Sequence, residues 1–360
     1  MVQTQIDPAR VLMTCAPESE AFALQEIRAI SPGIPTPRWL TDGVALFSPG
    51  MPYAEWAEAV RLAAPIFVRH IAPVQWEINL DGSNSDLVAL VGLVPCLAAH
   101  LDNARGFAVQ SRIIGAGKLP YHKFSLNSAL STAMEHMTGA TMVCREPDQI
   151  LSVLCMPSRG YLGLSDAALN RSPWPGGEHR FKRDDGQICR SEFKLLEAFR
   201  TFDLRLPERG QRYSGRALDL GAAPGGWTRV LRQHGYAVTA VDPADLDARI
   251  RCDPSVQHVR RRAEEFLMSV KSRFAMLVND MRKDPLDSVN IMLQAQPLLL
   301  PGASAVLTLK LPHAVGASTD TMQTVRMCLD RLARSYAIVG ARQLYHNRSE
   351  VTVALRARSD

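Results

Sequence analysis

Three features that would place the chain in a special class of protein are missing from its 360 residues. No apolar run reaches the ~18 residues of a membrane-spanning helix, so we expect no membrane partner. The seven cysteines form no C-x-x-C pair and their number is odd, which argues against a disulfide framework and against a metal site. The opening MVQTQIDPAR has no apolar signal-peptide core, so we expect a cytoplasmic protein.

Composition and length then set the size and class of the protein. Hydrophobic residues make up 46% and charged residues 21%, so the chain can bury cores and is not disordered as a whole. Its 360 residues predict two domains of ordinary size. The formal net charge of +5 is mild, and it permits an anionic partner without requiring one.

The first half of the chain mixes strand and helix patterns without regular alternation. Helices are expected at 18–30, 52–62 and 125–136, and strands at 11–13, 43–47, 66–74, 106–113, 150–154 and 160–164. This order predicts an α+β domain over residues 1–165. The turn-rich run SPWPGG then predicts a linker over residues 166–190.

Residues 191–360 show strands that alternate with helices. Strands are expected at 216–220, 237–241, 274–278, 303–309, 336–340 and 350–355, with helices at 191–199 and 227–234. Alternation predicts an α/β fold with a mostly parallel, doubly wound, Rossmann-like sheet. The two consecutive strands at the end predict an antiparallel edge.

The clearest motif is LDLGAAPGGW at 218–227, which joins a strand to a helix through a tight turn. Glycine lets a backbone approach a ligand and adopt positive φ, and the following helix N-terminus favours a phosphate or a carboxylate. Asp242 ends the next strand, where a carboxylate can accept both hydroxyls of a ribose. We therefore expect an adenosine-containing cofactor on these residues: Gly221, Ala223, Pro224, Gly225, Gly226, Trp227 and Asp242.

Two cofactors fit such a turn. Gly221, Ala223 and Gly226 match the dinucleotide motif G-x-G-x-x-G imperfectly. Ala223 stands where the second glycine should admit a pyrophosphate, and Pro224 stiffens the turn. We therefore favour S-adenosylmethionine (SAM), and NAD stays the alternative.

Four charged residues accompany this motif, and we call them the charged tetrad: Lys194, Asp280, Lys310 and Glu350. Asp280 and Lys310 follow strands, and ligands of parallel α/β sheets bind beyond the carboxyl ends of strands. Methyl transfer to a sugar hydroxyl needs a positioned base, and a lysine serves only when its pKa falls towards neutrality. We assign Lys310 as the base and Asp280 as the group that orients its amine. Lys194 would lower the pKa of Lys310 and hold the ribose, and Glu350 would neutralise Lys194.

The motifs SEFKLLEAF, LDLGAAPGGWT, VNDM and LKLP resemble the FtsJ-like family of RNA ribose 2′-O-methyltransferases, which carries a Lys–Asp–Lys–Glu tetrad. Together with SPW and LYHNRSEVTV they are closest to its RlmM type, which methylates a cytidine of 23S ribosomal RNA. The resemblance covers residues from about 150 to 356. It implies SAM as cofactor, with contacts at Ser191, Ala223, Pro224, Gly225, Gly226, Asp242 and Asp280.

The resemblance also implies an RNA-binding, THUMP-like domain over residues 1–165, with large-subunit rRNA and not DNA as the partner. Phe181, among the cations of 179–183, and His346 are further candidates for RNA contact. Two other functions stay open: 2′-O-methylation of a tRNA, a cap or a small molecule, and a catalytically silent RNA-binding or ribosome assembly factor. The sequence does not predict an oligomeric state.

Overall fold

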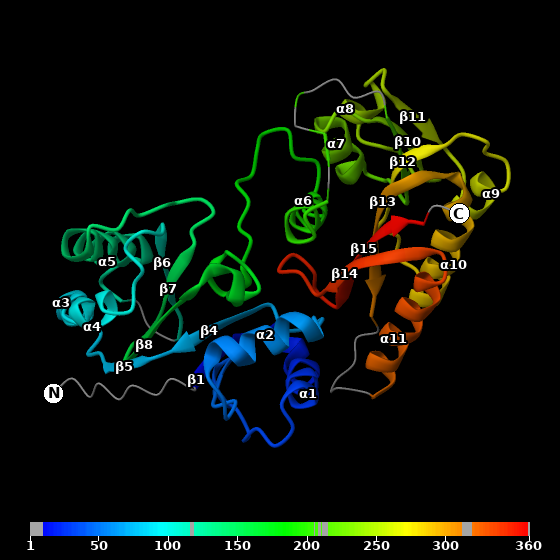
Figure 1. The fold of residues 1–360 in the computed structure, drawn as a ribbon. Coiled ribbons are helices and arrows are strands. Elements are labelled where there is room, and N and C mark those ends of the chain that lie inside the picture. The colour runs from blue at the N-terminus through cyan, green and yellow to red at the C-terminus, as the bar shows by residue number, and fades with distance from the viewer. Residues whose placement is uncertain are drawn as a thin grey trace. The chain divides into compact units, whose positions relative to one another are not determined.

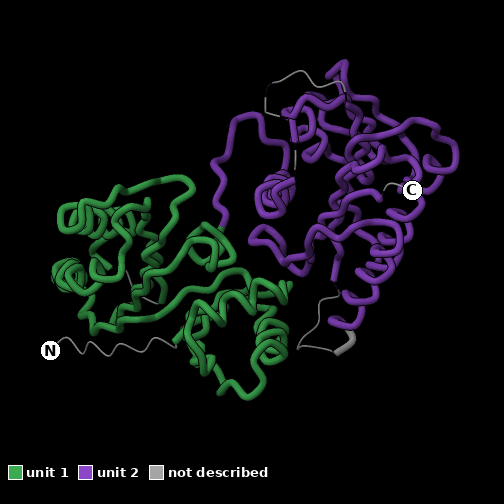
Figure 2. The backbone as a smooth tube through the Cα atoms, in the orientation of Figure 1, with its two compact units in different colours: residues 1–178 green, residues 179–360 purple. Residues whose placement is uncertain are grey.

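The computed structural model describes residues 10–115, 119–204, 206–207, 210, 215–311 and 319–358. Most of the opening MVQTQIDPAR therefore lies outside the described residues. The chain divides into two compact units, residues 1–178 and residues 179–360 (Figure 2). This division lies within the segment 166–190, whose role as a linker between domains ending at 165 and starting at 191 stays a prediction.

The first unit begins with an antiparallel sheet in the order β2-β3-β1-β4. Its strands are β1 (Arg10–Thr14), β2 (Arg38–Thr41), β3 (Val44–Phe47) and β4 (His70–Val74). Two helices accompany this sheet, α1 (Glu20–Ile30) and α2 (Tyr53–Ala63). Helix α2 buries Tyr53, Trp56, Ala57 and Val60, and this spacing gives one apolar helix face.

The second sheet of this unit has the order β5-β8-β7-β6. Its strands are β5 (Trp76–Asn79), β6 (Phe107–Ile113), β7 (Gln149–Met156) and β8 (Arg159–Asp166), and only the β6–β7 pairing is parallel. The helices are α3 (Ser85–Val91), α4 (Val94–Ala98) and α5 (Lys123–Thr138). Leu126, Leu130 and Met134 of α5 pack into one core with Leu151 and Val153 of β7. The mixed strands and helices agree with the expected α+β class.

The strand expected at 66–74 is wrong in its first half, because β4 begins only at His70. The carboxylate of Glu26 accepts hydrogen bonds from the backbone N–H groups of Ile66 and Phe67, at 2.6 and 2.8 Å. Arg171 donates to the carbonyl of Val68 at 3.2 Å. Side chains therefore satisfy the backbone groups that a sheet ladder would otherwise use.

The second unit is built on a sheet in the order β11-β10-β9-β12-β13-β15-β14. Its strands are β9 (Arg216–Leu220), β10 (Ala237–Val241), β11 (Val256–Val259), β12 (Phe274–Asn279), β13 (Leu299–Lys310), β14 (Tyr336–Arg342) and β15 (Glu350–Ala357). The pairings from β11 to β13 are parallel, whereas β15 is antiparallel to both β13 and β14. The predicted α/β fold with an antiparallel edge is therefore confirmed.

Helices cover both faces of this sheet. Figure 1 shows α6 (Glu192–Thr201) and α7 (Gly226–Gln233) on one side, and α10 (Pro285–Ala295) and α11 (Thr319–Ala333) on the other. The short helices α8 (Ala248–Arg251) and α9 (Ala263–Leu267) follow β10 and β11. The chain runs outwards from β9 to β11 and then returns to β12 on the other flank of β9. Such a reversal opens a crevice at the carboxyl ends of β9 and β12, where α/β proteins bind ligands.

Candidate active site

The Gly-rich turn begins at the carboxyl end of β9 and needs glycine at several points. Gly221 has φ 75° and Gly225 has φ 110°, both in the left-handed region that favours glycine. A Cβ on Gly221 would collide with Met281, which follows β12, and one on Gly226 would collide with Cys189. The turn therefore lies tightly against the end of β12 and the segment before α6.

Helix α7 starts at Gly226, its N-cap residue is Gly225, and no side chain caps its N-terminus. The N–H groups of a first helical turn have no partner within the helix, and they carry partial positive charge. Below this turn the Thr228 hydroxyl donates to the fully buried carboxyl of Asp219 at 2.6 Å. Burial raises the pKa of Asp219 to about 7, against a hydrogen bond from Thr228 that lowers it.

Three other predicted cofactor residues surround the turn. Asp242, just after β10, accepts hydrogen bonds from the N–H groups of Ala223 at 3.1 Å and Ala244 at 2.8 Å. The Trp227 indole donates to the carbonyl of Ser191 at 2.7 Å and so ties α7 to the start of α6. The Ser191 hydroxyl lies 2.9 Å from Cys189 Sγ. Hydrogen bonds thus join Asp242 to Ala223 and Trp227 to Ser191 around the turn.

The four side chains of the charged tetrad lie together. Lys194 Nζ is 3.2 Å from both carboxylate oxygens of Asp280, and 3.1 and 2.9 Å from those of Glu350. Lys310 Nζ is 2.9 Å from Glu350 Oε1 and is also hydrogen-bonded to Asp280 Oδ1. Each side chain is 15–17% exposed, so the cluster is largely desolvated but open to solvent.

The sheet register explains this convergence. Lys310 ends β13 and lies directly opposite Glu350, the first residue of the antiparallel strand β15. Asn279 of β12 lies opposite Leu220 of β9, so Asp280 and Gly221 leave neighbouring strands at the same level. Helix α6 carries Lys194, whose side chain contacts Asp280 and Glu350. The last residue of the LKLP motif, Pro312, lies outside the described residues.

Opposite charges control protonation within the charged tetrad. Burial by itself lowers the pKa of Lys194, but the nearby carboxylates of Asp280 and Glu350 raise it above its ordinary value. Burial likewise raises the pKa of Glu350, yet Lys310 and Lys194 hold it below its ordinary value. Glu350 is therefore ionised and Lys194 is protonated near neutral pH.

Sequence reasoning missed two residues that hold the loop before Glu350. The buried carboxylate of Glu197 accepts hydrogen bonds from the N–H groups of Tyr345 at 2.8 Å and His346 at 2.9 Å. Asn347 accepts from the N–H of Leu344 and from the Thr352 hydroxyl, both at 2.9 Å. Glu197 comes three residues after Lys194 in a predicted helix. Residues at this spacing are neighbours on a helix surface, so the sequence offered a signal that Glu197 lies near the charged tetrad.

The two proposed RNA-contact residues, Phe181 and His346, belong to an aromatic cluster around Phe193 of α6. The rings of Phe181 and Phe193 are stacked, with centroids 5.7 Å apart and planes inclined by 14°. The His346 ring lies 5.6 Å from Phe181 and 5.1 Å from Phe193. Phe193 directly precedes Lys194, so this cluster adjoins the charged tetrad along α6.

No group of three or more His, Cys, Asp or Glu side chains among the described residues is arranged to hold a metal ion. None of the helices described is long and apolar enough to cross a membrane.

Comparisons with known proteins relate this geometry to a family. The model described as FtsJ-like methyltransferase matches residues 187–304. The chain is 36% identical over 222 residues to the ribosomal RNA large subunit methyltransferase M of Halorhodospira halophila, a match that covers 61% of each protein. It is 34% identical over 206 residues to the protein of that name from Pseudomonas syringae pv. syringae, covering 54% of each. The chain thus matches less than two thirds of the length of these relatives.

Among solved structures, TrmN from Thermus thermophilus is similar over 97% of this chain and 99% of that chain. The sequence identity is 16% and the TM-score is 0.39.

Proposed function

Because residues 187–304 match the model described as FtsJ-like methyltransferase, we propose that the chain methylates a ribose 2′-hydroxyl of RNA with SAM as the methyl donor. The observation that carries this proposal is the mutual contact of Lys194, Asp280, Lys310 and Glu350 beside the Gly-rich turn. A sugar hydroxyl is a poor nucleophile, and a base held next to a methyl donor removes that obstacle.

The residues of the turn fit SAM. The uncapped N-terminus of α7 offers N–H groups to the carboxylate of the methionine moiety. Asp242 lies at the end of β10, where a carboxylate can accept ribose hydroxyls, and its present bonds to Ala223 and Ala244 fix its position. Ser191, Gly221, Pro224, Trp227 and Asp280 complete the proposed cofactor site. When bound, SAM would supply an electrophilic methyl group.

We assign Lys310 as the general base. As the 2′-oxygen takes the methyl group, whose bond to the SAM sulfur breaks to leave a neutral thioether, the hydroxyl proton would pass to Lys310 Nζ, which must be neutral to accept it. Lys194 keeps its proton, because Asp280 and Glu350 raise its pKa. Asp280 would orient the amine of Lys310, while Glu350 would position Lys194, which holds the ribose.

The substrate is inferred from the curated relatives, whose names specify the large ribosomal subunit. We propose that a cytidine of 23S rRNA is methylated, in the cytoplasm, and that residues 1–165 form a THUMP-like domain that binds this RNA. Only RNA carries the ribose 2′-hydroxyl, so the chemistry itself excludes DNA.

Incubation with an unmodified in vitro transcript of large-subunit rRNA and labelled SAM tests this function. We expect label in a nuclease-resistant dinucleotide, which marks a 2′-O-methylated ribose. Unmodified tRNA and capped RNA serve as parallel substrates, and labelling of either in place of rRNA would redirect the assignment. Absence of label from all three would indicate a catalytically silent RNA-binding or assembly factor.

A further inference from the structure

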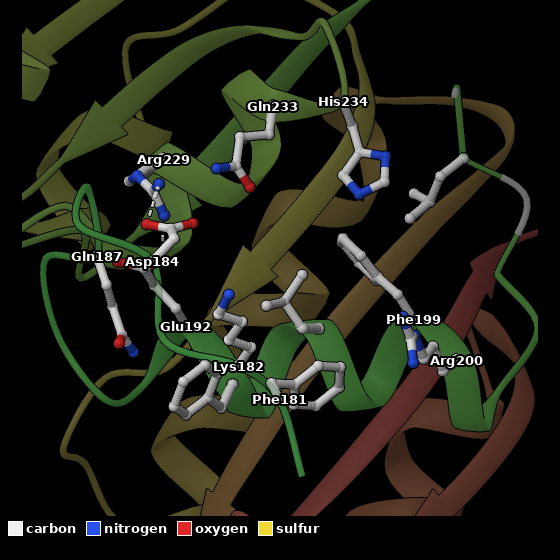
Figure 3. A pocket seen from close by; sticks show the side chains of 13 residues that line it. Phe181, Lys182, Asp184, Gln187, Glu192, Phe199, Arg200, Arg229, Gln233 and His234 are labelled. Atoms are coloured by element: carbon white, nitrogen blue, oxygen red, sulfur yellow. Dashed lines mark hydrogen bonds and ion pairs between the residues drawn. The ribbon is translucent and has the colours of Figure 1, made fainter. Parts of the chain in front are cut away.

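A second pocket lies in the same unit, between the segment 181–187, helix α6 and helix α7 (Figure 3). We call it the α6–α7 pocket; its volume is about 490 Å³. Sites for small ligands usually measure ~300–1,000 Å³, so one nucleotide fits. None of the four charged-tetrad residues and no residue of the turn 221–226 lines it, so it is separate from the site described above.

One wall of the α6–α7 pocket is apolar. Phe193, Leu196 and Phe199 recur every three residues on α6, which brings their side chains to one side of the helix. The ring of Phe181 stacks on Phe193 and extends this wall. Aromatic and aliphatic side chains of this kind bind the flat faces of unpaired nucleobases in a sequence-tolerant way.

The rest of the lining is polar and carries more positive than negative charge. Three cations line the pocket against two carboxylates, and both carboxylates, Asp184 and Glu192, are paired with Arg229 at 2.7 Å. Figure 3 shows the side chains of Lys182 and Gln233 turned towards the space above α6. No hydrogen bond to the Gln233 amide occurs among the described residues, so its donor and acceptor are available to a base edge.

Helix α6 fixes this pocket close to the proposed site of methyl transfer. Phe193 lines the pocket and Lys194, the next residue, belongs to the charged tetrad. Consecutive residues of a helix point in directions about 100° apart, so the two sites open on adjacent sides of α6. Lys182 and its neighbour Arg183 are exposed, and they can contact a phosphate backbone that passes between the two sites.

Building on the proposed function, we propose that the α6–α7 pocket binds one unpaired base of the RNA substrate next to the nucleotide that is methylated. The base lies against Phe193, Leu196 and Phe199, and the Gln233 amide hydrogen-bonds its edge. Lys182 contacts the neighbouring phosphate. The pocket thereby contributes to selecting a single-stranded or splayed-out target.

Crosslinking of the full chain tests this proposal. The probe is an in vitro transcript of large-subunit rRNA in which part of the uridine is replaced by 4-thiouridine, and crosslinked peptides are identified by mass spectrometry. We expect crosslinks within 181–187 or 192–200. The pocket-filling variant Leu196→Trp should lose them and should bind the transcript about tenfold more weakly, as expected for one lost stacking contact. Gln233→Ala, a change at a half-exposed side chain that does not threaten folding, should weaken binding several-fold.

The matched control is Lys271→Ala, because Lys271 is an exposed cation before the amino end of β12, at the opposite end of the strand from Asp280. It should crosslink and bind as the unchanged protein does. Crosslinks that avoid both segments, or unchanged binding by both pocket variants, would overturn the proposal. Methyl incorporation into the same transcript is measured separately. Methylation without pocket crosslinks refutes only the pocket, whereas pocket crosslinks without methylation refute only the proposed function.

Discussion

Glu350 and Asp219 are both acids of the second unit with little exposed surface, and their pKa values move in opposite directions. Burial would raise the pKa of Glu350, but two lysine ammonium groups within 2.9 Å hold it low. Asp219 is 1% exposed, and its carboxyl is hydrogen-bonded to the neutral hydroxyl of Thr228, so burial raises its pKa to about 7. The difference shows that the partner, and not burial alone, sets the charge of an acid in this protein.

The same contrast separates a reactive region from a supporting one. The charged tetrad holds two amines and two carboxylates in contact, and the proposed proton transfer takes place on one of these amines. Asp219 lies beneath the Gly-rich turn and links β9 to α7 through Thr228, so it supports the turn without needing a charge. Four changes, in order of decreasing expected effect, test this contrast.

Lys310→Ala should have the largest effect. Loss of a general base lowers turnover by about 10³-fold, and Lys194, the other amine of the charged tetrad, keeps its proton because Asp280 and Glu350 raise its pKa. Methyl incorporation into rRNA measures turnover, and calorimetric titration with SAM should show unchanged binding. Near-normal turnover would remove Lys310 from the role of base.

Asp219→Asn should change how stability depends on pH. Below pH ~4 residue 219 is protonated in the folded and unfolded chains, whereas from there up to its folded pKa of about 7 only the folded chain keeps the proton. The free energy of unfolding of the natural protein, relative to the asparagine variant, should therefore fall by up to about 4 kcal/mol as the pH rises from 4 to 7. Urea unfolding at several pH values measures this, and parallel profiles for the two proteins would contradict the pKa shift.

Glu197→Gln should reduce kcat by about tenfold to 10²-fold, because the loop that delivers Glu350 loses one charged acceptor for two N–H groups. The KM for SAM should stay unchanged, since the cofactor residues belong to other segments. Steady-state kinetics separates the two constants. A rise in the KM for SAM with unchanged kcat would show that Glu197 acts on the cofactor site and not on the position of Glu350.

Lys283→Ala should have the smallest effect. Lys283 pairs with Glu264 at 2.7 Å, but both side chains are more than a third exposed, so solvent screens the pair. We expect no measurable change in the unfolding midpoint or in turnover, which makes this variant the matched control for Lys310→Ala. A clear loss of turnover would mean that the effects of lysine removal are not confined to the charged tetrad.

The sequence predicted the second unit better than the first. In the second unit the strands β9, β10 and β12 are short and buried, and the turn that follows each of them marks its end. The four-residue strand β11, which is only partly buried, was not predicted. In the first unit the strands β2 and β5 and the helices α3 and α4 were not predicted, because segments of four to seven residues give too few periods for a pattern. The strand at 66–74 was predicted to begin too early. Glu26, which is distant in the sequence, accepts hydrogen bonds from the N–H groups of Ile66 and Phe67, and no local pattern reveals this contact.

Residue type and order alone determined the Gly-rich turn, the α/β class and the identity of the four charged residues. The backbone conformation of a tight turn and the end of a strand both depend on residues that are close in the sequence. Tertiary structure alone decided that Lys310 faces Glu350 across two antiparallel strands, that Glu197 holds the loop before Glu350, and that burial raises the pKa of Asp219. Each of these depends on which segments meet across the sheet. The segments that meet determine which groups surround a side chain, and these groups set its charge. Its neighbours in the sequence do not.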